Sequence, residues 1–447
     1  MKKVLFLRLI LAFCVFLNAT FLGAATLQFK DGSVIRDAEV EDILRRFTNP
    51  IFKAAGLDPL DVKLFLLADN SVNAVTTPGP MILVNTGLII RCGRVEELIA
   101  VLAHETGHAA RKHLVGRLEA FQNATMPYLL SMGLGAIVSI LTGTPDGLML
   151  GSALGQQVGT RSFLTFSRTQ EMQADFVSHT VLEKLKWPID GSISLFERLQ
   201  AFSDIPSTKA VYTQTHPAAH ERIQVAKRRC NPLYRLPPDF APLFDRLRIK
   251  ILAYMLHPSD ILKNPLIQKS PIKAYAFLIA ALRQGDLKKA EGLCQKLLKQ
   301  NPRDAYLYEM ATQIYLEQGA LSKAEAVVEK VFQLQARPHV SFYILKARLL
   351  MVRKKEVMQT RALLQQAILL EPSSPEPWYW LSILAGAQKR SAALYYLAEY
   401  NVRLGLFVQA ERQVALAKKG LSSKDPLYVH LSDLDMMLKD QRRRMGA

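Results

Sequence analysis

The chain has 447 residues and a mass of 50.1 kDa, with 49% hydrophobic and 21% charged residues. This composition excludes an intrinsically disordered protein and predicts two or three folded domains. Only four cysteines are present, which excludes a scaffold built on disulfides. The net charge is +18, and residues 231–447 carry 33 basic against 19 acidic side chains. That half suits an ordinary solvated surface or contact with acidic lipid head groups, acidic proteins or nucleic acid.

The first residues have the pattern of a secretory signal. Two lysines precede an uninterrupted apolar run, Leu9–Leu17, and the Gly-Ala-Ala of residues 23–25 allows cleavage after Ala25. We therefore expect residues 1–25 to be a signal peptide that directs export. The alternative is a retained membrane anchor over residues 4–25.

Helix is expected first, over residues 37–56, followed by a small sheet. Three β-type runs follow, at residues 62–67, 72–77 and 81–84. Pro78-Gly79-Pro80 separates the last two runs. Because Pro80 cannot donate to a ladder, we expect the strand that starts at Met81 to lie at or near a sheet edge. From Arg94 onward the pattern predicts helix.

A second apolar stretch, Met126–Leu141, is shorter than the roughly 20 residues needed to span a bilayer. A turn-rich break and a segment of small residues follow it. Residues 126–160 therefore predict either a buried helical hairpin or a hairpin that touches a membrane or covers an active site.

The strongest chemical signal is Val101-Leu-Ala-His-Glu-Thr-Gly-His-Ala-Ala. On a helix, His104 and His108 leave the same face, so both imidazoles can bind one zinc ion. Glu105 then lies beside the metal, where a metalloprotease needs its general base. A catalytic zinc also needs a third protein ligand and a position for water.

Glu171 and Asp175 are candidates for completing this site. They are four residues apart on one predicted helical face. One carboxylate can bind zinc while the other accepts the remote N–H of a ligand histidine. The alternative for such a pair is a solvated helix face.

Together, His104-Glu105-x-x-His108 and Glu171-x-x-x-Asp175 resemble the gluzincin metallopeptidases of the CaaX prenyl endopeptidase and HtpX type. The resemblance implies that Glu171 is the third zinc ligand and that Asp175 supports the histidines. Further similar segments are Asn73-Ala74, Val84-Asn85-Thr86-Gly87-Leu88, Thr215-His216-Pro217 and Glu221-Arg222-Ile223, so the resemblance covers about residues 35–230. One departure is Thr76-Thr77, near which the family has an aromatic or apolar residue.

His216 is a further candidate for the active site. Pro217 favours the first turn of a helix and so sets His216 at the helix start. The resemblance implies that His216 faces the zinc, where it either binds the metal at rest or stabilises an oxyanion. His220 is a weaker candidate, because isolated histidines are usually not ligands.

Substrate binding is expected along the Met81–Val84 strand. An extended chain can align there by β-augmentation. The candidate substrate-binding residues are Asn73, Met81 and Leu83.

The second half has a repeated pattern typical of a tetratricopeptide solenoid. Three similar segments begin at Gly285, Gly319 and Gly405, each with an alanine five residues later. The first two are 34 residues apart, which is the tetratricopeptide period, with glycine at the turn between helices and alanine packed inside the second helix. We expect about four units over roughly 270–435, with irregular middle units because the third spacing breaks the period.

The expected fold class is thus mostly α, with a zinc metallopeptidase domain that holds a small β-sheet, followed by a tetratricopeptide α-solenoid. The predicted boundaries are a metallopeptidase domain at 26–230, connecting helices at 231–269 and repeats at 270–447. The predicted function is an exported zinc metalloendopeptidase. Its arrangement resembles periplasmic proteases that help outer-membrane β-barrel proteins to assemble and degrade those that stall.

This resemblance implies partners as well as a location in the periplasm. We expect unfolded or stalled protein clients, the outer-membrane β-barrel assembly machinery and peripheral membrane contact, and no nucleic acid. An alternative function is a tetratricopeptide binding module with little proteolysis. An integral membrane protease is a third hypothesis, but it requires further long apolar spans.

Overall fold

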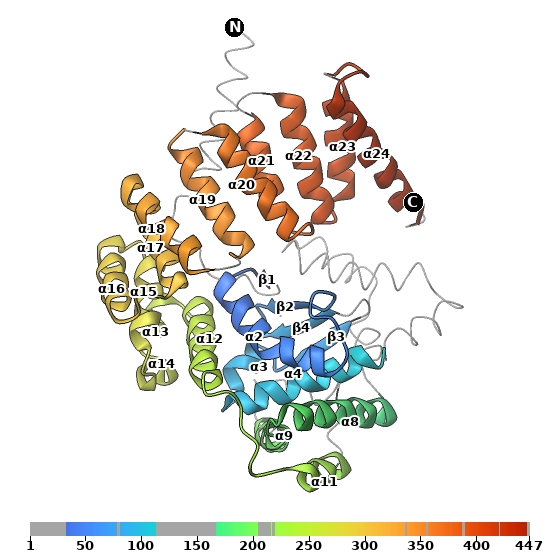
Figure 1. Cartoon of the computed structure of the whole chain (residues 1–447), viewed down its shortest axis with the longest axis vertical. Coiled ribbons are helices and arrows are strands. Elements are labelled where there is room, and N and C mark those ends of the chain that lie inside the picture. The colour runs from blue at the N-terminus through green and yellow to red at the C-terminus, as the bar shows by residue number, and fades with distance from the viewer. Residues whose placement is uncertain are drawn as a thin grey trace. The chain divides into compact units, whose positions relative to one another are not determined.

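The computed structural model describes residues 33–77, 81–112, 167–203, 216, 220–335, 338–354, 356–386, 389–419 and 421–444. The predicted signal peptide and the apolar stretch at 126–160 lie outside these residues. Helices dominate the described chain and accompany one four-stranded sheet, which confirms the predicted fold class (Figure 1). Within the described residues, the structure has no helix with the length and apolar character that a membrane span requires.

By its internal contacts the chain divides into two compact units. One contains residues 249–366, and the other contains residues 30–248 and 367–447. The sheet and the metallopeptidase motifs belong to the second unit.

The sheet has the order β1-β2-β4-β3. Its strands are β1 (Val34–Ile35), β2 (Lys63–Leu67), β3 (Ala74–Thr77) and β4 (Met81–Asn85). β4 pairs in parallel with β2 on one side and antiparallel with β3 on the other. The strand that starts at Met81 therefore lies near an edge, as predicted, but not at it: β1 and β3 are the two edge strands of the described sheet.

The register of β3 and β4 separates two faces of the sheet. Thr76 pairs with Ile82 on one face, where Thr76 contacts helix α4. Side chains alternate along a strand, so Met81 and Leu83 belong to the opposite face. There Leu83 packs with Leu67 and Val75, and Met81 lies against this cluster.

Helix α2 (Ala38–Ala54) agrees with the predicted first helix. Asp37 caps its start by accepting a hydrogen bond from the Val40 amide. Gly56 follows its end with a φ of 79°, a conformation that glycine adopts without strain. Its apolar stripe packs against α4 (Val95–Ala110), which follows the short α3 (Thr86–Arg91) and also contacts β3 and β4.

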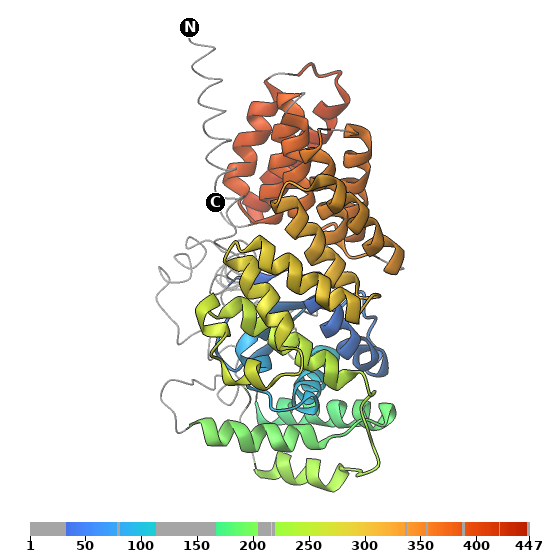
Figure 2. The ribbon, with the colours of Figure 1, turned by 90° about the vertical axis from the view of Figure 1, so that its left-hand side faces the viewer.

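Helix α8 (Arg168–Leu185) packs closely against α4. Gly107 permits this approach, because a Cβ atom there would lie 2.5 Å from the Ala174 carbonyl oxygen. A reciprocal capping box between Ser167 and Gln170 begins α8. Helix α9 (Asp190–Ser203) packs against α4, and α11 (His220–Arg229) packs against both α9 and α8. The views in Figure 1 and Figure 2 both place α11 next to α8.

Three helices follow α11 in the chain. They are α12 (Phe240–Met255), α13 (Pro258–Ile261) and α14 (Pro265–Lys269). The repeat helices of the 249–366 unit are α15 (Lys273–Arg283), α16 (Leu287–Gln300), α17 (Ala305–Glu317), α18 (Leu321–Leu334) and α19 (Val340–Val352). Helix α20 (Val357–Leu370) crosses the boundary between the units. Later helices are α21 (Glu376–Gly386), α22 (Arg390–Arg403), α23 (Phe407–Lys418) and α24 (Pro426–Arg444).

The repeated glycines lie at the turns between helices, as the sequence predicts. Gly285, Gly319 and Gly405 have φ values of 74°, 72° and 73°. The alanines that follow them, Ala290, Ala324 and Ala410, are fully buried. Gly285 and Gly319 close α15 and α17, whereas Gly405 closes α22. The third glycine therefore belongs to a pair of helices with a different phase, which explains its irregular spacing.

Candidate metal centre

Helix α4 supplies two histidines from one buried face. His104 and His108 are one helical turn apart, and their Nε2 atoms lie 3.1 Å from each other. Both rings are buried, and Glu105 between them is fully buried. Apolar residues before the motif, including Leu98, Val101 and Leu102, hold this turn of α4 in the core.

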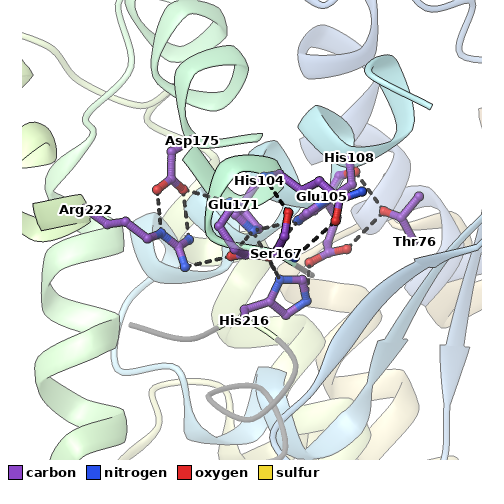
Figure 3. A network of polar contacts seen from close by, with 10 residues as sticks. Thr76, His104, Glu105, His108, Ser167, Glu171, Asp175, His216 and Arg222 are labelled. Atoms are coloured by element: carbon purple, nitrogen blue, oxygen red, sulfur yellow. Dashed lines mark hydrogen bonds and ion pairs between the residues drawn. The ribbon is translucent and has the colours of Figure 1, made fainter. Parts of the chain in front are cut away.

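Two residues from other segments complete the cluster. Glu171 on α8 places Oε1 3.3 Å from His108 Nε2 and Oε2 3.4 Å from His104 Nε2. His216 Nδ1 lies 3.3 Å from His104 Nε2 and 3.0 Å from Glu171 Oε1. Figure 3 shows the four side chains converging. The structure thus brings together all the residues that were predicted to face the metal.

The spacing of these atoms suits zinc. Zinc binds histidine nitrogen and carboxylate oxygen at roughly 2.0–2.2 Å, so tetrahedral ligand atoms lie about 3.3–3.5 Å apart. The donor atoms here are 3.0–3.4 Å from their neighbours. Glu105 Oε1 is buried and, within the described residues, has no hydrogen-bond partner. A carboxylate oxygen in that state is suited to receive a proton at the centre.

Thr76 on β3 holds Glu105 in place. Its hydroxyl lies 2.7 Å from the Glu105 carbonyl oxygen and 3.0 Å from Glu105 Oε2. Burial raises the pKa of Glu105, which brings this carboxyl closer to the pKa of an efficient general base. This contact gives a reason for a threonine at position 76, where the similar family has an aromatic or apolar residue: the Thr76 hydroxyl binds the Glu105 carboxylate. Sequence reasoning noted the unusual residue and missed this partner.

Asp175 orients His104. Its Oδ1 atom lies 2.9 Å from His104 Nδ1, which leaves His104 Nε2 for the metal. Burial lowers the pKa of His104, but hydrogen bonds to Asp175 and Glu171 outweigh burial and raise that pKa to about 9. Burial lowers the pKa of His108 well below its ordinary value and so favours the neutral imidazole that binds metals.

Arg222 on α11 joins both carboxylates of α8. Its Nη1 atom lies 2.7 Å from Glu171 Oε2, and its Nε atom lies 2.6 Å from Asp175 Oδ2. Burial opposes the charge on Glu171, but its hydrogen bonds with the three histidines lower its pKa far below the ordinary range. Sequence reasoning quoted Arg222 only as part of a motif. The spacing of six residues between His216 and Arg222 was the sequence signal that could have placed Arg222 at the metal centre.

The predicted substrate-binding residues do not join this cluster. Met81 and Leu83 lie on the far face of the sheet. Asn73 precedes β3, and its carbonyl accepts a hydrogen bond of 3.0 Å from the Asn85 amide. His220 is exposed and contacts Gln224, which agrees with its low ranking as a ligand.

Comparison with known proteins identifies the folded unit around this centre. Residues 35–230 match peptidase family M48. This match covers less than half of the chain. Residues 281–349 match the tetratricopeptide repeat, which confirms the predicted order of peptidase and repeats.

Proteins similar to this chain carry two kinds of name. The Escherichia coli (strain K12) beta-barrel assembly-enhancing protease is 21% identical over 294 residues, which cover 64% of this chain and 60% of the relative. The protein of that name from Yersinia pestis is 22% identical, with 79% and 75% covered. The Schizosaccharomyces pombe mitochondrial metalloendopeptidase OMA1 is 27% identical, with 41% and 50% covered. The match therefore spans about three fifths of the Escherichia coli relative.

Proposed function

We propose that this protein is a zinc metalloendopeptidase. The observation that carries the proposal is the buried cluster of His104, His108, Glu171 and His216 beside the carboxylate of Glu105. Zinc has no redox chemistry and, when bound, acts as a Lewis acid toward a peptide carbonyl and makes water more acidic. His104, His108 and Glu171 would hold it in the M48 domain.

Glu105 is proposed to move the proton during hydrolysis. It takes a proton from the attacking water and passes it to the nitrogen of the leaving amine. Thr76 fixes the Glu105 side chain, so the proton is accepted at a defined place. Burial excludes bulk water from this carboxylate and raises its pKa toward the working range.

His216 is proposed to restrain the enzyme at rest. Its Nδ1 atom stands among the other donor atoms, at the distance expected for a fourth ligand, and its Nε2 atom lies 3.4 Å from Glu105 Oε1. In this position His216 competes with water for the place where catalysis needs it. The alternative is that His216 withdraws from the ligands and stabilises the oxyanion.

Substrate is proposed to enter along β3 instead of β4. Within the described sheet, β3 pairs only with β4, so its other side offers backbone groups to an extended chain. The same strand carries Thr76, whose hydroxyl reaches Glu105. An extended substrate on β3 therefore runs close to the general base, and compact proteins are excluded because they cannot supply a free strand.

The biological setting is proposed from the sequence and from the names of the relatives. Residues 1–25 direct export to the periplasm, residues 26–230 cleave, residues 231–269 connect, and residues 270–447 bind protein clients. The clients are unfolded or stalled envelope proteins, with outer-membrane β-barrel assembly as the process served. Contacts with the β-barrel assembly machinery and with the membrane surface are part of the same proposal.

The test uses the full chain and its Glu105→Gln variant. The variant should keep its zinc and lose cleavage of an unfolded substrate such as casein, because only the proton acceptor is removed. Equal zinc with undiminished cleavage would contradict the mechanism. A wild-type protein that binds zinc and clients without cutting them would favour the binding module. The Glu105→Gln protein also serves to trap clients in cell envelopes for identification.

A further inference from the structure

Arg222 occupies an unusual position for a charged side chain. It comes from α11, is only 4% exposed, and inserts between the two carboxylates that α8 presents at the centre. These carboxylates are one helical turn apart and would repel each other without a cation. We propose that Arg222 is a positioning residue. It determines which oxygen of Glu171 faces the metal and, through Asp175, which ring nitrogen of His104 faces the metal. This inference rests on the proposed zinc site.

The contact with Glu171 divides the roles of its two oxygens. The guanidinium Nη1 atom lies 2.7 Å from Oε2. The other oxygen, Oε1, lies 3.3 Å from His108 Nε2 and 3.0 Å from His216 Nδ1. Oε2 also lies 3.4 Å from His104 Nε2, so both oxygens border the cluster, but Arg222 contacts Oε2. Arg222 therefore favours Glu171 as a ligand through Oε1, because Oε2 already has a charged partner. A Glu171 released from Arg222 is free to turn both oxygens toward a metal ion.

The contact with Asp175 acts on His104. Arg222 donates from Nε to Oδ2 at 2.6 Å and from Nη2 to Oδ1 at 2.9 Å. Asp175 Oδ1 also accepts from His104 Nδ1 at 2.9 Å. Figure 3 shows this chain from Arg222 through Asp175 to His104. One guanidinium thus fixes the carboxylate that selects the tautomer of a ligand histidine.

Arginine chemistry is needed for this arrangement. Three nitrogens of one rigid plane contact two carboxylates, which a lysine ammonium on a flexible stem does not reproduce. The plane is itself supported, because the Arg222 guanidinium lies 5.2 Å from the ring centre of Phe196 on α9.

The same pair of helices provides a matched control. Arg229, also on α11, contacts Glu183 on α8 with Nε–Oε1 and Nη2–Oε2 distances of 2.8 and 2.6 Å. Its guanidinium lies 5.5 Å from the ring centre of Phe176. This ion pair joins α11 to α8 as Arg222 does, but neither of its residues belongs to the metal centre. Arg229→Gln therefore controls for the loss of an ion pair between α11 and α8, at a site more exposed than that of Arg222.

The experiment compares Arg222→Lys, Arg222→Gln and Arg229→Gln in the full chain. Zinc release to a chromophoric chelator should be about ten- to a hundredfold faster in both Arg222 variants, the usual effect of disturbing a ligand's supporting contacts, and unchanged in Arg229→Gln. The visible spectrum of cobalt-substituted protein should weaken in the Arg222 variants, since five-coordinate cobalt absorbs less than tetrahedral cobalt. Circular dichroism of the metal-free proteins checks that folding is retained.

Two results would overturn the inference. The first is zinc release and a cobalt spectrum that are the same in both Arg222 variants as in Arg229→Gln. The second is an Arg222→Lys protein whose zinc release and cobalt spectrum equal those of the wild type, which would show that only the positive charge of Arg222 matters. If Arg222→Gln does not fold, Arg222→Lys carries the test. Failure of the wild-type protein to bind zinc would instead contradict the proposed function, so the two failures are distinguishable.

Discussion

The metal centre and the repeat helices are stabilised in opposite ways. At the centre, charged and polar side chains from α4, α8, α11 and the segment at His216 are buried together, so each has several partners. In the repeats, short helices pack through apolar side chains and small alanines, with the glycine turn recurring along the chain. A change at the centre should therefore alter metal binding and activity, whereas a change in the repeats should alter stability locally.

The largest effect is expected from Glu171→Ala. It removes one of the three protein ligands and leaves the buried Arg222 without a carboxylate partner on that side. Zinc content, measured by elemental analysis, should fall severely because ligand loss weakens metal binding directly. An undiminished zinc content would show that Glu171 is not a ligand. It would also contradict the expectation that changes at the centre alter metal binding.

Asp175→Ala is expected to have the next largest effect. The ligands remain, but His104 loses the partner of its Nδ1 atom. Metal affinity or activity should fall about ten- to a hundredfold while the fold is kept. Wild-type zinc affinity and cleavage together would return Asp175 to a surface role.

Removing His216 distinguishes its two proposed roles. If it restrains the resting enzyme, His216→Ala should cleave an unfolded substrate several-fold faster, because water gains access to the fourth position. If it stabilises the oxyanion, the rate should fall roughly a hundredfold with full zinc content. The rate and the zinc content are measured in parallel, and an unchanged rate would exclude His216 from the active site.

The last comparison makes the same small substitution, glycine to alanine, once in the repeats and once beside the metal centre. In α16, Gly292→Ala adds a methyl group to a site with no atom within 4 Å. It should stabilise that region by about 0.5–1 kcal/mol, since alanine favours helix over glycine. In α4, Gly107→Ala places a methyl group 2.5 Å from the Ala174 carbonyl oxygen. It should destabilise the protein and loosen zinc, because α4 and α8 must separate.

Thermal unfolding and zinc release measure both glycine variants. Equal stabilisation at the two sites would show that the close approach of α4 and α8 is not required for the metal centre. Destabilisation at both sites would contradict the open environment of Gly292.

Much of the fold could be predicted because its signals are local. The four-residue spacing of His104 and His108 places both on one face of any helix. The period between Gly285 and Gly319 likewise fixes a repeated turn. The strand order could not be read in this way, since β4 pairs with both β2 and β3 and its neighbours depend on how the chain crosses the sheet. The sequence therefore placed the Met81 strand at or near an edge without deciding that β3 lies outside it.

The sequence by itself determined which residues can bind a metal and transfer a proton: two histidines, a glutamate between them and a carboxylate pair. It also determined the repeat of glycine and alanine that packs the helices. These follow from helical geometry and from the chemistry of single side chains. Only the tertiary structure decided their partners. Thr76 reaches Glu105, and Arg222 reaches Glu171 and Asp175, from segments far away in the chain. A buried charge or hydroxyl must find its partner in space, and no local pattern specifies which distant residue that is.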